Sequence, residues 1–97
     1  MEVKFIWDET KRRENLRKHG FDFVEASVVL DSRYRMDVPV VRGLEIRVQS
    51  FSYVMNRLEV LTVVHLDRGK VTRIISYRSA SKKESEVYYD WISKENE

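Results

Sequence analysis

The sequence contains no cysteine, and this absence rules out two ways of stabilising a small protein. Without thiols the chain forms neither disulfide bonds nor the thiolate zinc sites on which many small domains depend. Its two histidines, His19 and His65, stand far apart, and no local motif groups carboxylates beside either of them. We therefore expect no metal ion and no other cofactor, and a fold that rests on its hydrophobic core.

Long apolar runs and familiar catalytic motifs are absent as well. The longest apolar stretches are only a few residues long and the first residues contain no apolar signal segment, so we expect a cytoplasmic protein. The sequence also has no glycine-rich phosphate loop, no serine nucleophile elbow and no HExxH motif. The local sequence therefore indicates neither a nucleotide-binding protein nor a serine hydrolase nor a zinc protease.

What is present is enough sequence for one domain, with its positive charge in the middle. The 97 residues, 42% apolar and 35% charged, suit a single domain over residues 1–97 with one core. Residues 33–78 hold nine Lys or Arg against four Asp or Glu, whereas residues 82–97 hold three Lys against five acidic residues. Eleven of the 18 cations are arginine, whose planar fork of donors suits phosphate oxygens. This distribution favours a polyanionic partner, and the alternative is a basic surface that binds nothing specific.

Hydrophobic periodicity predicts an α+β fold with the element order β-α-α-β-β-β-β-α. The predicted strands cover residues 3–6, 33–37, 45–50, 58–66 and 71–78, and the predicted helices cover residues 8–20, 22–31 and 81–94. Pro39 is expected to close the second strand. The strand at 58–66 is apolar on both faces and is expected at the centre. Strands joined by short turns predict an antiparallel sheet of four to five strands, with two helices before the main run of strands and one after it.

The first predicted helix is unlike the others because it has almost no apolar face. Asp8 is a typical N-cap and Gly20 a typical C-terminal stop, but Leu16 is the only large aliphatic residue between them. At spacings of three or four, polar side chains share one face and offer donors to a common anion; they are Lys11, Asn15, Lys18 and His19. The alternative is a solvated helix held by ion pairs along its own surface.

The strand at 71–78 contributes further polar groups. Strict alternation places Arg73 and Tyr77 on one face and Ser76 and Arg78 on the other, so at most one of these pairs is expected to line a common site. Arg78, at the end of the strand, is the better placed to point into a cleft. Arg47, on the strand at 45–50, completes the set of candidate residues.

An excess of cations over carboxylates suits one kind of chemistry in particular. RNA is cleaved without metal when its own 2′-hydroxyl is deprotonated, the phosphorane charge is stabilised and the 5′-oxygen is protonated. His19, with an ordinary pKa of about 6.5, suits the proton transfer, and the alternative is a histidine that only complements the helix dipole. His65, within an apolar strand, is expected to be buried and structural. Aromatic residues are expected to pack rather than to stack on bases, namely Trp7, Tyr88 and Trp91.

A family resemblance covers nearly the whole chain, from about residue 5 to residue 89. It is carried by Phe5, Trp7-Asp8-Glu9, Lys11, Asn15, Lys18-His19-Gly20, Phe23, Ala26 and Asp31, then by Gly43, Glu45 and Arg47, and then by Arg73-Ile74-Ile75-Ser76, Arg78, Ala80, Glu84, Glu86 and Tyr88. With these residues the sequence resembles the BrnT family of toxins from type II toxin–antitoxin systems. The resemblance implies a fold similar to the RelE-type ribonucleases and a growth-arresting ribonuclease.

The resemblance also implies partners and roles. The family's antitoxin, BrnA, is similar to ribbon-helix-helix repressors, and the toxin–antitoxin complex binds operator DNA mainly through the antitoxin. Carried over to this chain, the pattern makes His19, Lys18 and Arg78 the catalytic residues. RNA contacts are then expected from Lys11, Asn15, Arg47, Arg73 and Ser76. Tyr77 departs from the family pattern, which often has alanine there, and its phenol is expected to narrow the cleft or to stack on a base. The alternative function is a non-catalytic homologue that binds the antitoxin or RNA.

Overall fold

The computed structural model describes residues 3–95 of the chain. Its elements, in chain order, are β1 (Lys4–Ile6), α1 (Glu9–His19), the 3-10 turn η1 (Phe23–Glu25), α2 (Ser27–Leu30), β2 (Met36–Arg42), β3 (Glu45–Val54), β4 (Glu59–Arg68), β5 (Val71–Ser79) and α3 (Lys82–Glu95). The predicted α+β class is confirmed. No helix within this part of the chain is long and apolar enough to cross a membrane.

The five strands form one mixed sheet in the order β1-β5-β4-β3-β2. Strands β2 to β5 are joined by turns and pair antiparallel, and β4 lies at the centre, as predicted. The expectation of a purely antiparallel sheet is wrong, because β1 pairs parallel with β5 through Lys4–Val71, Phe5–Thr72 and Ile6–Arg73. The chain leaves β1 through the helices and enters the sheet again at its far edge, and such a long crossover permits parallel pairing.

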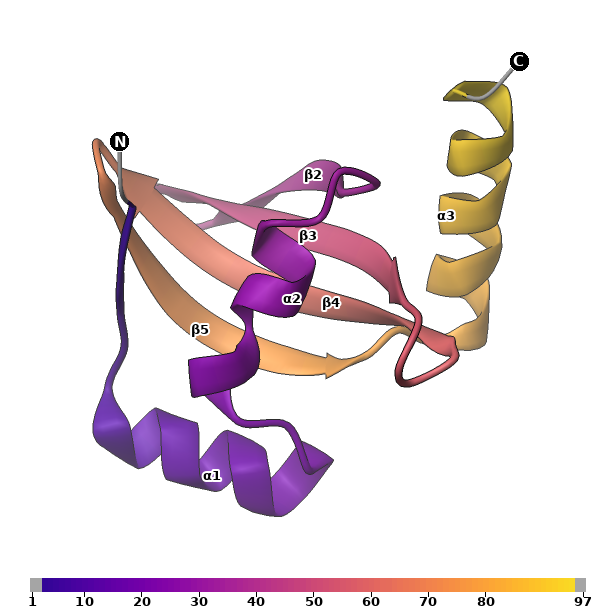
Figure 1. Ribbon diagram of the computed structural model, residues 1–97. Coiled ribbons are helices and arrows are strands. Elements are labelled where there is room, and N and C mark those ends of the chain that lie inside the picture. The colour runs from indigo at the N-terminus through magenta and orange to yellow at the C-terminus, as the bar shows by residue number, and fades with distance from the viewer. Residues whose placement is uncertain (1–2, 96–97) are drawn as a thin grey trace.

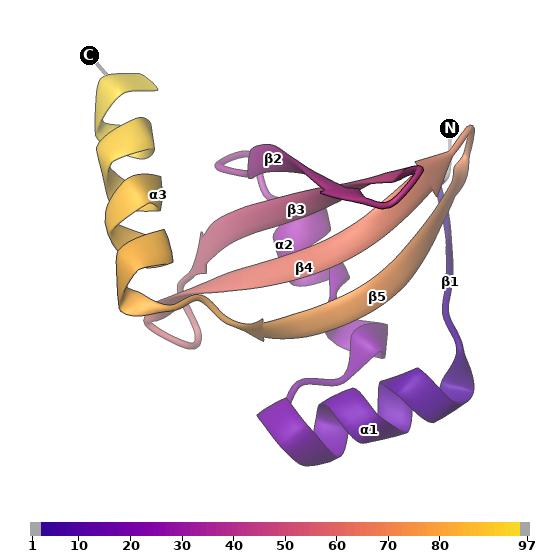
Figure 2. The same cartoon turned by 180° about the vertical axis from the view of Figure 1, so that it is seen from behind.

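Helices cover the two faces of the sheet unequally. The 3-10 turn and α2 lie on one face, and α3 stands against the other face at the end where β5 finishes (Figures 1 and 2). The larger apolar cluster is on the α2 face and contains Phe23, Ala26, Val29, Leu61, Val63, Ile74 and Tyr77 among others. The smaller cluster, on the α3 face, contains Met36, Phe51, Val60 and Tyr88, with Trp91 packed against it. Within residues 3–95, no helix covers the half of the α3 face away from that cluster (Figure 2).

Two predicted elements differ in form from the observed ones. The single helix expected at 22–31 is a 3-10 turn followed by one turn of α-helix. Its most deeply buried residues, Phe23, Ala26 and Val29, are spaced by three, which is the period of a 3-10 helix. The strand expected at 33–37 runs instead from Met36 to Arg42 and contains Pro39. Proline is tolerated there because β2 is an edge strand.

Candidate active site

The charged helix α1 has the ends that the sequence predicts. The carboxylate of Asp8 accepts a hydrogen bond from the backbone N–H of Lys11 at 3.2 Å, and Gly20 follows the helix with φ +78°. Glycine adopts this left-handed conformation without strain. Leu16, the only large aliphatic residue of the helix, is 39% exposed. Another residue therefore has to hold α1 in place.

That residue is Asn15, the one residue of α1 that is buried. Its amide nitrogen donates to the carbonyl oxygens of Phe21 at 2.9 Å and Tyr77 at 2.7 Å, and its oxygen accepts from the N–H of Tyr77 at 3.1 Å. Tyr77 lies on the edge of β5 beyond the stretch that pairs with β1, so without Asn15 its backbone N–H and carbonyl would be unpaired. Asn15 thus fastens α1 to this edge, and its amide is occupied rather than available to RNA.

This attachment brings the end of α1 to the end of β5. His19 is the last residue of the helix, and its pKa is lowered by partial burial and by the positive charges of Lys18 and Arg78. The three residues predicted to be catalytic therefore lie close enough to interact electrostatically, although they come from segments about 60 residues apart. An imidazole with a lowered pKa is neutral near pH 7 and free to accept a proton.

Arg78 is held by a carboxylate from α3. Its Nη1 and Nη2 donate to the two Glu84 oxygens at 2.9 and 3.1 Å, and Nη1 also donates to the carbonyl oxygen of Ser79 at 3.1 Å. Gln49 donates to the same carboxylate at 3.2 Å. Hydrogen bonds from Arg78, opposed by burial and aided by the backbone of Ser81, lower the pKa of Glu84 to about 2. An arginine has five N–H donors, so Arg78 keeps Nε–H and one Nη2–H for a further ligand.

A bulge in β5 decides which side chains accompany Arg78. Ile74 pairs with His65 and Ser76 with Val64, which leaves Ile75 without a partner in the ladder. The extra residue shifts the alternation, so that Ile74 and Tyr77 both enter the α2-face core although they are three residues apart. The prediction that Arg73 and Tyr77 share a face is therefore wrong.

The polar residues of β5 instead share the α3 face. Arg73, Ser76 and Arg78 pair with Leu66, Val64 and Thr62, which alternate along β4 and so lie on one side of it. Ser76 and Arg78 share a face as predicted, and the bulge adds Arg73 to them. Arg78 comes five positions after Arg73, which is about 16 Å along a strand. Ser76 lies between them.

A cluster of arginines occupies the uncovered end of this face. On β5, Arg73 pairs with Leu66 of β4. On β3, Val48 pairs with His65, so the preceding residue, Arg47, is placed opposite Leu66 as well. Arg47 and Arg73 therefore lie on either side of Leu66. Arg47 donates to Glu45 at 2.7 Å. The pKa of Glu45 is lowered by this hydrogen bond and also by the charges of Arg47, Arg68 and Arg73.

Lys11 lies apart from both groups on α1. It is exposed and stands one helical turn before Asn15, so it is on the side of the helix that meets β5. Sequence reasoning did not assign a role at the site to Gln49, Arg68 or Glu84. Glu84 has the residue type and the spacing from Ser81 that are typical of a capping box, which the structure confirms through two hydrogen bonds of 2.8 and 3.1 Å. Its pairing with Arg78 depends on how α3 docks, which no local pattern encodes.

A second polar arrangement is buried on the α2 face. His65 is 1% exposed, as predicted for a structural histidine, with Nε2 2.7 Å from the Ser50 hydroxyl and Nδ1 2.7 Å from Asp67. This order resembles a serine-hydrolase triad, but Ser50 is completely buried and donates to Asp37 at 2.6 Å. A substrate has no access to that hydroxyl. Nowhere in residues 3–95 do three or more histidines or carboxylates gather as metal ligands.

Residues 7–84 match the family model described as "Ribonuclease toxin, BrnT, of type II toxin-antitoxin system". A search of curated proteins gives no match. The matched segment runs from Trp7 to Glu84, so it contains α1, strands β2 to β5 and every candidate residue described above.

Proposed function

The chain belongs to the BrnT family of ribonuclease toxins of type II toxin–antitoxin systems, and from this premise we propose that it cleaves RNA without a metal ion. The proposed catalytic residues are His19, Lys18 and Arg78. The observation that carries the proposal is the attachment of α1 to β5 through Asn15 and Tyr77, at a junction where partial burial and the charges of Lys18 and Arg78 lower the pKa of His19. The order of the elements also supports a relationship to the RelE-type fold.

In the proposed reaction the RNA supplies its own nucleophile. His19, neutral near pH 7, accepts the proton of a 2′-hydroxyl, and the 2′-oxygen attacks the adjacent phosphorus. The bond to the 5′-oxygen breaks, which yields a 2′,3′-cyclic phosphate and a 5′-hydroxyl that takes its proton from water. Lys18 and Arg78 stabilise the charge of the phosphorane. Arg78 does so through Nε–H and Nη2–H, while Glu84 holds the rest of the guanidinium in position.

The rest of the RNA is proposed to lie along the uncovered part of the α3 face. Arg47 and Arg73 bind backbone phosphates there, Ser76 lies on the path between them and Arg78, and Lys11 contacts the backbone from α1. Asn15 serves the site by positioning α1, because its amide is occupied by backbone groups.

Membership of a type II family implies an antitoxin partner and an RNA substrate. We further propose that the antitoxin is a BrnA-like ribbon-helix-helix protein, that the complex binds operator DNA through it, and that the free toxin arrests growth in the cytoplasm. A small reading frame of that class beside the gene would support this part of the proposal. A partner of a different fold would contradict it without affecting the proposed chemistry.

Incubation of purified protein with RNA in EDTA tests the chemistry. We expect cleavage to continue and the products to end in 2′,3′-cyclic phosphate or 3′-phosphate. The double variant His19→Ala, Arg78→Ala should leave the RNA intact and be harmless when expressed, whereas Lys83→Ala, which removes an exposed cation from α3, should behave as wild type. Loss of cleavage in EDTA would reject the metal-free mechanism. Intact RNA and normal growth with the wild-type protein would instead favour the non-catalytic alternative.

A further inference from the structure

A hollow opens on the α3 face at the end of the sheet away from α3, where β2 turns into β3 and β4 ends (Figure 2). Its volume is about 570 Å³. Leu66 of β4 supplies an apolar surface, and Arg42 of β2 and Arg68 of β4 add two guanidinium groups. Glu45 of β3, which pairs with Arg42 across the hairpin, lines the hollow as well.

Two guanidinium groups of the hollow have no carboxylate of their own. Glu45 accepts a hydrogen bond from Arg47 at 2.7 Å, so its charge is already compensated. Asp67 is turned to the opposite face of the sheet, where its carboxylate bonds to the buried histidine. Within residues 3–95, Arg42 and Arg68 form neither an ion pair nor a side-chain hydrogen bond. The hollow therefore carries two uncompensated positive charges.

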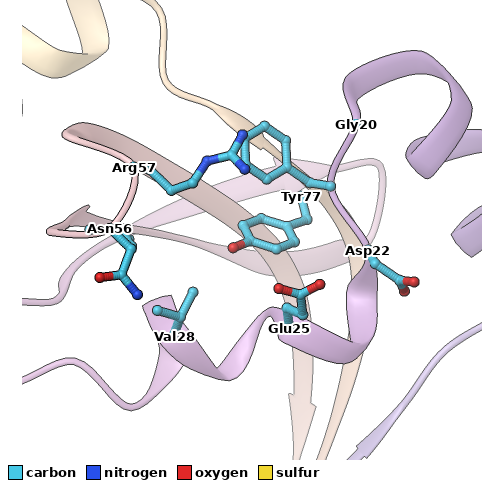
Figure 3. A pocket seen from close by; sticks show the side chains of 9 residues that line it. Gly20, Asp22, Glu25, Val28, Asn56, Arg57 and Tyr77 are labelled. Atoms are coloured by element: carbon cyan, nitrogen blue, oxygen red, sulfur yellow. The ribbon is translucent and has the colours of Figure 1, made fainter.

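A cavity on the other face of the sheet has the opposite character (Figure 3). Asp22 and Glu25 line it, and their carboxylates would repel a phosphate. The arginine that lines it, Arg57, is engaged: its guanidinium lies 4.5 Å from the centre of the Phe21 ring and 3.8 Å from the carboxylate of Glu59. This cavity does not suit an anion, whereas the hollow on the α3 face does.

We propose that the hollow binds the terminal phosphate monoester of an RNA chain. A phosphodiester within the chain carries one negative charge, whereas a monoester carries about 1.5 to 2 at pH 7 and has three free oxygens. The monoester therefore matches the two uncompensated charges, and its oxygens accept hydrogen bonds from the forks of both Arg42 and Arg68. Leu66 offers an apolar surface to the sugar or base of the same nucleotide. Monoesters at the 5′ and 3′ ends of RNA share this chemistry.

The position of the hollow suits the end of the RNA path proposed above, on which this inference rests. Leu66 lies between Arg47 and Arg73, so the hollow adjoins the arginines that are proposed to bind backbone phosphates. Arg73 is about 16 Å along β5 from Arg78. Beyond the hollow the sheet ends at the turns that join β2 to β3 and β4 to β5. A chain with its scissile phosphate at Arg78 thus reaches the hollow where the face ends.

Fluorescence anisotropy with 2′-O-methylated oligonucleotides, labelled at an internal base, tests the hollow without requiring cleavage. Three forms of one sequence are compared: with a 5′-phosphate, with a 3′-phosphate and with hydroxyls at both ends. We expect one phosphorylated form to bind roughly fivefold to thirtyfold more tightly than the hydroxyl form, as two exposed ion pairs would give. Arg42→Ala and Arg68→Ala should each lower this preference roughly threefold to fivefold and change binding of the hydroxyl form by less than about twofold. The matched control Arg33→Ala, outside the hollow, should keep the preference.

The outcomes separate this inference from the proposed function. The phosphorylated form that gains affinity identifies which end of the RNA the hollow binds. A preference for a terminal phosphate in a protein that does not cleave RNA would support the hollow and contradict the enzymatic function. Equal binding of the three forms would overturn the inference, as would variants at Arg42 and Arg68 that weaken all three forms equally, because the hollow would then hold an internal phosphate. Neither result would affect the ribonuclease proposal.

Discussion

Asn15 shows which features of the structure can be inferred from a residue's position in a helical pattern and which cannot. The spacing of Lys11, Asn15, Lys18 and His19 indicated one face of one helix, and the structure confirms the helix and its two ends. The spacing did not indicate that this face meets the edge of a strand about 60 residues away in the sequence. Asparagine offers a donor and an acceptor to either RNA or a peptide group. Only the tertiary structure distinguishes the two.

Replacing Asn15 by alanine should therefore act on stability. The change leaves the N–H and carbonyl of Tyr77 and the carbonyl of Phe21 without their partner, and buried unpaired groups are costly. We expect the free energy of unfolding, measured in urea, to fall by about 2–3 kcal/mol. The exposed neighbour Glu14→Ala serves as the control and should change it by less than about 0.5 kcal/mol. A fully stable Asn15→Ala protein that no longer binds RNA would restore the original interpretation of Asn15 as an RNA ligand.

The lowered pKa of His19 predicts how the rate of RNA cleavage depends on pH. Its pKa is lowered by burial and by the charges of Lys18 and Arg78, so it becomes protonated only below its usual pH of about 6.5. If the neutral imidazole is the base, kcat/KM should fall as the pH drops through that lowered value and should be level above it. Lys18→Ala removes one of the charges and should move the acid limb to higher pH. If kcat/KM of the His19→Ala variant still falls at the same pH, a group other than His19 causes the fall.

At the scale of the element, patterns that depend on neighbours in sequence were more informative than those that depend on pairing. The caps of α1, the capping box of α3 and the central position of β4 were all predictable, because hydrogen bonds within a few residues or simple apolarity decide them. The bulge at Ile75 was not, because it is a property of the register between β4 and β5. That single extra residue determines that Arg73, Ser76 and Arg78 share a face, and so it determines the site.

The docking of α3 on β5 yields a prediction about stability against pH. The folded-state pKa of Glu84 is about 2, below its ordinary value of 4.5, because Arg78 and the Ser81 N–H bind its charged form. The stabilisation is therefore complete above about pH 4.5 and is lost as the pH falls toward 2. Glu84→Gln should lower the free energy of unfolding by about 1–2 kcal/mol at pH 7, after allowance for solvent screening, and by progressively less at acid pH. Glu86→Gln, an exposed change on the same helix, is the control. A difference that does not shrink between pH 4.5 and pH 3 would rule out the ion pair as its source.

At the scale of the whole molecule, the net charge of +2 conceals a separation of charge, and the distribution of charged residues along the sequence reveals only part of it. The sequence indicated a basic middle and an acidic end, but not that α3 would bring one acidic residue, Glu84, onto the last arginine of β5. The arginines farther along the same face have no such partner from α3. The uncovered half of the α3 face is therefore left more basic than the half beside the helix.

This arrangement predicts how RNA binding depends on salt. Each phosphate neutralised on a single strand contributes about −0.7 to the slope of log K against log salt concentration. If Arg47 and Arg73 each bind a phosphate, Arg47→Ala and Arg73→Ala should each make the slope less steep by about 0.7, and the double variant by about 1.4. A 2′-O-methylated oligonucleotide, which lacks the nucleophilic hydroxyl, allows the binding to be measured without cleavage. Arg33→Ala, whose guanidinium lies 5.4 Å from the centre of the Tyr34 ring and outside the arginine cluster, is the matched control. Equal changes in slope for Arg33→Ala and Arg73→Ala would mean that RNA senses only the total charge of the protein, and the path along the α3 face would then be wrong.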